Sequence, residues 1–483
     1  MIIDDVSEST TLKATQTPPS PHRLSARGAS PSPPPYVSYQ AITPDFTTPV
    51  LAARRKKRQR KSGRRKCIVV ASVVLNCLLF VLLLRVARRQ RGSRGSEERD
   101  GDDIIVLPKP KSPRIRPVVP DARLGRCTRT ATWSNATRLS SDDDFPFSSD
   151  ASFEFPASSS LMFLLSQGAL SGGDFNVLPS SEAVPRVVLN ARYHSLHVRD
   201  RANVCWMERK RAGGEGIGIF TPAAFDGQAS TDKLDFTITL FLPARDASST
   251  SLPIYNLETD LPSFAHTLDS LQGTLEFDRL SLRSQNRPIV VQSLFAKNAT
   301  IHTSNGLISG SFETSSSLSL VTSNAPIDAS ITLHSRNIFA TTDLVLQTRN
   351  AQLESAVNLL TSAASGVGGK FSVKAETSDG PLVMSFPKSP SHSLLTLDAQ
   401  TSNSPADVWL NSAFEGEFTL ASNMVVVDRR PFLDPRNLRS VLYGDYKNGM
   451  IVGTVLWKMP IFKSKVQGKV RVATTNHLLK FFV

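Results

Sequence analysis

A six-residue phrase recurs through the C-terminal half of the chain, and this recurrence constrains the fold more than any other feature. Every copy begins with Thr or Ser and carries Asn or Asp at its third position. The copies are SQNRPI (284–289), TSNGLI (303–308), TSNAPI (322–327), TRNAQL (348–353), TSDGPL (377–382) and TSNSPA (401–406). Their third residues are Asn286, Asn305, Asn324, Asn350, Asp379 and Asn403, and a weaker seventh copy, ASNMVV, centres on Asn423. Asn and Asp tolerate left-handed backbone angles and hydrogen-bond their own chain, so each phrase predicts a tight turn.

The runs between the phrases alternate apolar and polar side chains. Examples are SLSLVT, SITLHS, TDLVLQT, KFSVKAET and SLLTLDAQT. This two-residue period predicts half-buried β-strands. One strand and turn bury little surface alone, so neighbouring units must stack or pair into a continuous core. The region is therefore expected to be mainly β. The phrase intervals of 19, 19, 26, 29 and 24 residues leave two architectures open, an irregular β-solenoid with projecting loops and an antiparallel β-sandwich.

An uncharged apolar run occupies residues 67–84 and reads CIVVASVVLNCLLFVLLL. As a helix its 18 residues would span roughly 27 Å, close to the hydrocarbon thickness of a bilayer. Ten basic residues lie in 54–66 before the run, and five lie in 85–94 after it. Because the more positive flank stays in the cytoplasm, the run predicts a single-pass protein of type II orientation, with an extracellular or lumenal C-terminus.

The net charge of +14 is concentrated beside this run. Residues 51–94 carry 15 Lys or Arg and no Asp or Glu, which leaves a net charge of −1 for the rest of the chain. Such a cluster acts on a membrane surface, and residues 54–66 are expected to attract anionic lipids at about 1 kcal/mol per side chain. A nucleic-acid-binding domain spreads basic charge over a folded face, so no nucleic-acid partner is expected.

Composition divides the chain into four parts. Residues 1–66 are predicted to be a disordered, basic cytoplasmic tail, because the Pro- and Ser-rich first 50 residues show no apolar periodicity. The transmembrane helix (67–84) follows, and the polar, Pro-containing residues 85–159 are expected to form a stalk or linker. Strand-like alternation begins near residue 160, so residues 160–483 are predicted to be the β-rich ectodomain.

The layout resembles a known arrangement. The train of T-S-N/D phrases separated by alternating strands resembles the adhesin-like β-repeat domains of bacteria, and is similar to fungal single-pass membrane proteins that carry such a domain after a basic-flanked span. The resemblance covers about residues 270–425. It implies a β-solenoid-like fold outside the cytoplasm and brings neither catalytic residues nor a ligand.

Two kinds of residue are informative if the C-terminal part lies outside the cytoplasm. Cys127 and Cys205 are the only cysteines beyond the apolar run, and they are candidates for one disulfide or for two unrelated buried thiols. Asn135 and Asn298 begin Asn-Ala-Thr sequons and are candidates for N-glycosylation, which would make the chain a glycoprotein. Asn298 could equally serve as a turn residue beside a repeat.

No catalytic, cofactor-binding or metal-binding motif is recognisable. His194 and His197 have the closest spacing to a ligand pair, but residues three apart on a strand point to opposite faces. The glycine-rich GGEGIG (213–218) lacks the Gly-Lys-Ser/Thr of a phosphate loop, and no G-x-S-x-G motif occurs. The sequence therefore predicts no enzyme and no cofactor.

The leading hypothesis is a membrane-anchored, extracytoplasmic β-repeat protein. Stacked repeats commonly bind through extended faces, so we expect a structural, adhesive or binding role at the cell surface or in the secretory pathway, with a glycan or protein ligand. The alternative is a membrane-anchored enzyme acting on wall glycans, since one fold can host many chemistries. Two carboxylates roughly 5 to 10 Å apart in a groove would favour that alternative. A membrane scaffold acting through its basic tail is the third hypothesis.

Overall fold

The computed structural model describes part of the chain, all of it within the compact unit Pro108–Val483. The described residues are 126–139, 144–209, 213–222, 233–245, 252–336, 339–429, 438–457 and 468–483. The predicted tail (1–66), the predicted membrane span (67–84) and the start of the predicted stalk lie outside them. Within the described residues, no helix is both long enough and apolar enough to cross a bilayer.

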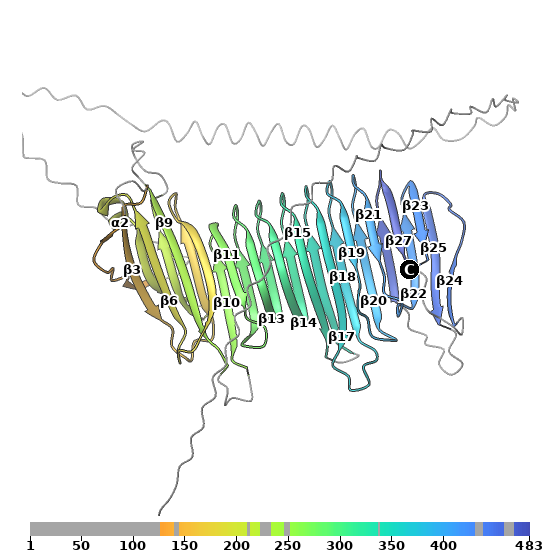
Figure 1. The fold of residues 1–483 in the computed structure, drawn as a ribbon, viewed down its shortest axis with the longest axis horizontal. Coiled ribbons are helices and arrows are strands. Elements are labelled where there is room, and N and C mark those ends of the chain that lie inside the picture. Colours follow the sequence, from red (N-terminus) through yellow and green to blue (C-terminus); the bar gives the residue numbers. More distant parts are fainter. Residues whose placement is uncertain are drawn as a thin grey trace, which may run out of the picture. The chain divides into compact units, whose positions relative to one another are not determined.

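The described chain is mainly β, as predicted, and each repeat forms one coil of a parallel β-solenoid (Figure 1). After its turn phrase the chain runs along one face, here face A, bends, and returns along the opposite face B to the next phrase. Face A contains β11 (Ser263–Ser270), β15 (Ile327–Ser335), β17 (Leu353–Thr361), β19 (Leu382–Ser385), β21 (Ala406–Trp409) and β27 (Leu478–Phe482). Face B contains β10 (Ile254–Asp260), β12 (Glu276–Arg283), β16 (Thr341–Gln347), β18 (Lys370–Glu376), β20 (Leu394–Gln400) and β26 (Gly468–Ala473). Strands β13 (Ile289–His302) and β14 (Ile308–Val321) continue through the bend and belong to both faces.

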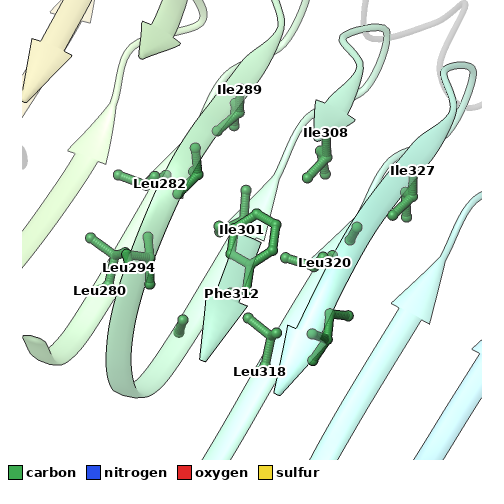
Figure 2. Packing of buried hydrophobic residues seen from close by; sticks show 14 of the residues in the cluster. Leu280, Leu282, Ile289, Leu294, Ile301, Ile308, Phe312, Leu318, Leu320 and Ile327 are labelled. Atoms are coloured by element: carbon green, nitrogen blue, oxygen red, sulfur yellow. The ribbon is translucent and has the colours of Figure 1, made fainter. Parts of the chain in front are cut away.

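The coils stack with the last residue of each phrase in register. The residues in this row are Ile289, Ile308, Ile327, Leu353, Leu382, Ala406 and Leu479. Alternate side chains of both faces point into the space between them, where Phe312 and Leu320 are fully buried (Figure 2). Burying one such Leu or Phe side chain stabilises the fold by about 1.5–3 kcal/mol, so the alternation seen in the sequence is what drives the two faces together.

At the N-terminal end, parallel coils are followed by antiparallel strands that close the solenoid. The elements are β1 (Arg126–Thr130), β2 (Thr137–Arg138), β3 (Phe147–Glu154), β4 (Met162–Gln167), β5 (Gly172–Ser180), β6 (Arg186–Tyr193), α2 (Leu196–Arg201), β7 (Asn203–Glu208), β8 (Glu215–Phe220) and β9 (Leu234–Pro243). The coil of β4 and β5 lies between the coil of β8 and β9 and the coil of β10 and β11. Beyond β8 and β9, antiparallel pairing with β7 and β6 replaces the parallel ladder, which leaves no open parallel edge there.

The C-terminal end is also non-sequential. It adds β22 (Gly416–Ala421), β23 (Met424–Asp428), β24 (Arg439–Tyr443) and β25 (Met450–Trp457). Strand β26 lies between β20 and β22, and β27 lies between β21 and β23. The coil of β22 and β23 is therefore separated from the preceding repeats by a coil made from later sequence. Antiparallel β25 and β24 then extend face B.

Two sequence expectations need correction, and one alternative is confirmed. The β-sandwich alternative is wrong, because the repeats pair in parallel. The irregular β-solenoid is the architecture found, and the extra residues of the longer phrase intervals lie in the bends, such as 362–369 and 386–393. The predicted ectodomain boundary at residue 160 is too late, since β1, β2 and β3 fall inside the predicted stalk. The short β3, FSSDASFE, buries its alternate residues, but its Ser and Asp content hides the pattern.

Candidate functional site

The predicted repeat-turn residues lie at one corner of the solenoid and form a ladder of side-chain amides. In each step Nδ2 of one Asn donates to Oδ1 of the residue in the preceding coil. The pairs are Asn305 to Asn286 (2.7 Å), Asn324 to Asn305 (2.6 Å), Asn350 to Asn324 (2.6 Å), Asn403 to Asp379 (2.7 Å) and Asn476 to Asn403 (2.9 Å). The ladder includes Asn476 of TTNHLL, which sequence reasoning missed because 73 residues separate it from Asn403. Asn423 lies in the turn between β22 and β23.

The ladder changes at Asp379. The backbone N–H of Asp379 donates to the carbonyl of Arg349, as its counterparts do in the other coils, so Asp379 stacks beside Asn350. An ionised carboxylate only accepts hydrogen bonds, and Asp379 accepts one from Asn403. It cannot donate to Asn350 in the way that an Asn would. The step from Asn350 to Asp379 therefore lacks the amide donor that the later coil supplies at the other steps of the ladder.

The first residue of each phrase adds a second set of bonds between coils. The Thr hydroxyl donates to the carbonyl that follows the ladder residue of the preceding coil, as in Thr348 to Ala325 (3.1 Å) and Thr401 to Gly380 (3.1 Å). These Thr side chains are buried, and so are the carbonyls that they satisfy. The phrase residues thus form a structural corner, in which the Thr hydroxyls and most of the ladder amides bond to the neighbouring coil.

Cys127 and Cys205 are joined by a disulfide, with their Cα atoms 5.7 Å apart. Cys127 lies on β1 and Cys205 lies on β7, which pair antiparallel. Cys205 is fully buried beside Phe163 and Phe220, and the bond fastens β1 to the closed end of the solenoid. Closing a loop with a sequence separation of 78 stabilises by about 4 kcal/mol in the chain-entropy model.

The two sequons have different surroundings. Asn135 is exposed in the segment between β1 and β2. Asn298 lies on β13, where its Nδ2 donates to the carbonyl of Asp278 (3.3 Å) and its Oδ1 accepts from the Ser317 hydroxyl (3.1 Å). A glycan on Asn298 would break these contacts with both neighbouring coils, so the folded structure favours Asn135 as the acceptor.

A cleft of about 390 Å³ lies on the bend side of the solenoid, and sequence reasoning did not find it. Side chains from five successive bends line it. They include Gln272 after β11, Glu276 at the start of β12, Phe295 on β13, Glu313 and Ser315 on β14, His334 on β15, Arg336 just after β15, and Ser362 after β17. The bends lie far apart in sequence and vary in length, so no repeating signal marks their residues.

Glu313 is at the centre of the polar contacts in the cleft. It follows buried Phe312 and precedes buried Thr314, so by alternation it points outward, yet its side chain is only 16% exposed. Its carboxylate accepts hydrogen bonds from Nε2 of Gln272 and from Nε2 of His334. The Phe295 ring packs edge-on against the His334 imidazole, with centroids 6.4 Å apart. Glu313 is therefore held by groups from two other bends, and Phe295 from a third packs on His334.

Other polar groups in the cleft have no partner among the described residues. The Ser315 Oγ atom is buried and makes no hydrogen bond. The Glu276 carboxylate lines the same cleft as Glu313, so the cleft brings together two carboxylates that are 37 residues apart in sequence. Such a cleft can accept hydrogen bonds from a polar ligand.

The histidines do not form a metal centre in the described part of the chain. His194 precedes α2 and His197 lies within it, so the strand geometry assumed for this pair is wrong. No group of three or more His, Cys, Asp or Glu among the described residues is placed to hold a metal ion. His266 is fully buried between Thr259 and Phe175, and burial lowers its pKa to about 4 despite its hydrogen bond to the Phe264 carbonyl. It is a core residue rather than a ligand.

Comparisons with known proteins give distant similarity only. No protein-family model and no curated protein matches the chain. Among solved structures, it is similar to a proposed cell adhesion protein from Clostridium sporogenes, with 9% identity, a TM-score of 0.15, and coverage of 69% of this chain and 98% of the other. It is also similar to a proposed adhesin from Parabacteroides distasonis, with 10% identity, a TM-score of 0.22, and coverage of 70% and 97%. TM-scores this low support no conclusion about what this chain binds.

Proposed function

We propose that the chain is a membrane-anchored β-solenoid that binds a glycan or protein ligand outside the cytoplasm, at the cell surface or in the secretory pathway. The observation that carries the proposal is the cleft on the bend side, which is lined by side chains from five successive coils, with polar side chains from four of them. Repeat proteins commonly bind through surfaces of this kind, built from equivalent positions of stacked units.

Two further features support an extracytoplasmic location. Disulfides persist in oxidising compartments, and the Cys127–Cys205 bond fastens the closed end of the solenoid. The sequon of Asn135 is exposed. The anchor itself rests on the apolar run 67–84 and on the excess of basic residues before it.

Protease protection in sealed microsomes tests the orientation. With the full chain inserted, we expect a protected C-terminal fragment and loss of an epitope placed in residues 1–66. Glycosidase treatment should reduce the apparent mass of the wild type, and Asn135→Gln should abolish that shift while Asn298→Gln leaves it. Digestion of the C-terminal part from the cytoplasmic side would contradict the proposal.

A binding panel tests the function. The full chain in detergent micelles is presented to immobilised glycans and extracellular proteins, and retention above that of empty micelles is expected for at least one class. Retention of nothing in both classes would refute a binding role.

The basic residues 54–66 are proposed to bind anionic lipids of the cytoplasmic leaflet. A synthetic peptide of these residues should partition onto vesicles containing phosphatidylserine and not onto phosphatidylcholine vesicles, and added salt should weaken the binding because the attraction is screened. Equal partition onto both vesicles would rule the interaction out.

A glycan-acting enzyme is the second candidate function, and the pair Glu276 and Glu313 in one cleft is the observation that favours it. Glycoside hydrolysis uses two carboxylates on either side of the scissile bond. Incubating the full chain with oligosaccharides and analysing the products by mass spectrometry tests this function. Cleavage that Glu313→Gln abolishes would support it, and intact oligosaccharides after prolonged incubation would exclude it.

A further inference from the structure

The shape of the cleft suits an extended ligand. Its lining residues come from five consecutive bends, and neighbouring strands in a sheet lie about 4.8 Å apart. Four such steps give a run of roughly 19 Å along the stacking direction. The cleft therefore offers side chains of successive coils to a chain molecule lying across the coils, rather than one deep pocket for a compact molecule.

The polar groups of the cleft leave hydrogen-bonding capacity for a ligand. The carboxylate of Glu276 and the buried hydroxyl of Ser315 have no partner among the described residues. The Glu276 carboxylate is partly exposed and can accept hydrogen bonds from ligand hydroxyls, whereas the Ser315 hydroxyl is enclosed by its neighbours. Glu313 is already held by Gln272 and His334, so its position is fixed before any ligand arrives.

The charge of the cleft is nearly balanced. The cleft is lined by two carboxylates, Glu276 and Glu313, together with the guanidinium of Arg336 and the imidazole of His334. A polyanion would meet both carboxylates, and a polycation would meet Arg336 together with any proton on His334. Neither gains the uniform field that steers a highly charged ligand to its site. The half-buried Phe295 ring adds one apolar surface among these polar groups.

We propose that this cleft binds a segment of a neutral saccharide chain, with Phe295 against the C–H face of a sugar ring and with the Glu276 carboxylate accepting hydrogen bonds from ring hydroxyls. A neutral sugar has an apolar face and a rim of donors and acceptors, which matches this set of groups. The inference rests on the proposed binding function and names its ligand class and site.

The test measures binding of the full chain in detergent micelles to oligosaccharides of graded charge. The neutral probes are oligomers of glucose, mannose and N-acetylglucosamine; galacturonate oligomers are the anionic probe and glucosamine oligomers the cationic probe. We expect at least one neutral probe to bind, and to bind more tightly than both charged probes. Glu276→Gln and Phe295→Ala should each weaken that binding about tenfold or more, because each removes a direct contact.

Controls separate loss of contact from loss of fold. Glu417→Gln changes an exposed carboxylate on β22, away from the cleft, and should leave binding within about twofold of the wild type. Phe295→Leu keeps an apolar side chain without the ring, and it should retain the melting temperature while weakening binding. Tightest binding of a charged probe, or neutral binding that the cleft variants do not change, would overturn the saccharide site. Binding of proteins but of no glycan would overturn this inference and leave the proposed function standing.

Discussion

The two corners of each coil differ in almost every respect. At the turn corner, Thr and Asn recur at fixed positions; the Asn amides bond to their counterparts one coil away, and the Thr hydroxyls donate to backbone carbonyls of that coil. At the bend corner, lengths range from the continuous strand of β14 to the eight residues 362–369, and the side chains are all different. Regularity thus marks the corner that maintains coil register. The irregular corner is free to carry a binding site, and the following predictions test this division from the largest expected effect to the smallest.

Glycines at the two corners should respond differently to substitution. A Cβ at Gly380, in a turn phrase, would overlap the backbone of Ala351 in the preceding coil. Gly380→Ala should therefore lower the free energy of unfolding by about 3 kcal/mol. At Gly366, in a bend, no atom lies within 4 Å of the added Cβ, and only its φ of +63° is unfavourable. Gly366→Ala should lose about 1 kcal/mol. Urea unfolding measures both values, and equal losses would remove the distinction between the corners.

Acid sensitivity should come from the interior rather than from either corner. Above pH 6.5, His266 is neutral in both folded and unfolded chains, so it contributes no pH dependence. Between about pH 6.5 and 4 the unfolded chain takes up a proton at His266 that the folded chain, with a pKa of about 4, does not. The free energy of unfolding should therefore decrease as the pH is lowered through this window, by up to about 3 kcal/mol.

Unfolding curves from pH 7 to pH 4 check this prediction. His266→Gln should be less stable at pH 7 but show a flatter pH dependence, because the titrating group is gone. An unchanged slope in His266→Gln would assign the acid sensitivity elsewhere.

An amide donor at position 379 should stabilise the ladder at the step from Asn350 to Asp379. Asp379→Asn supplies an Nδ2 that can donate to Asn350 and retains an Oδ1 for Asn403, so it should raise stability by about 1 kcal/mol at pH 7. The converse change, Asn324→Asp, removes the donor to Asn305 and should destabilise by a similar amount. Thermal unfolding of the pair measures both shifts. Destabilisation by Asp379→Asn would mean that the carboxylate has a role other than a ladder position.

Stability should be least affected in the cleft. Glu276→Gln changes a carboxylate that has no partner among the described residues, so the free energy of unfolding should stay within about 0.5 kcal/mol of the wild type. Chemical unfolding checks this value beside the binding measurements above. A large loss would place Glu276 among the residues that hold the fold.

The sequence predicts the turn corner well and the bend corner poorly, for physical reasons. Turn chemistry is local, so Asn305 or Asn324 can be read from its own six residues. Strand alternation is local too, and the mainly β class follows from it. Parallel pairing is not local, because alternation alone does not distinguish a solenoid from a sandwich. The cleft depends on which bends the stacking brings together. The local sequence around Glu276 or Ser315 therefore does not indicate that these residues line a cleft.

The placement of β26 and β27 has a consequence for biogenesis. In the described strands, β22 pairs in parallel only with β26, and β23 only with β27, and both partners are synthesised after β22 and β23. Vectorial folding, in which each new coil docks on the last, therefore halts after β20 and β21. The emerging β22 and β23 have no native parallel neighbour until residues 468–482 reach the gap. The coil of β22 and β23 therefore cannot join the parallel ladder until that segment is in place, and a ribosome-bound chain lacking it leaves β20 and β21 without their next parallel neighbours.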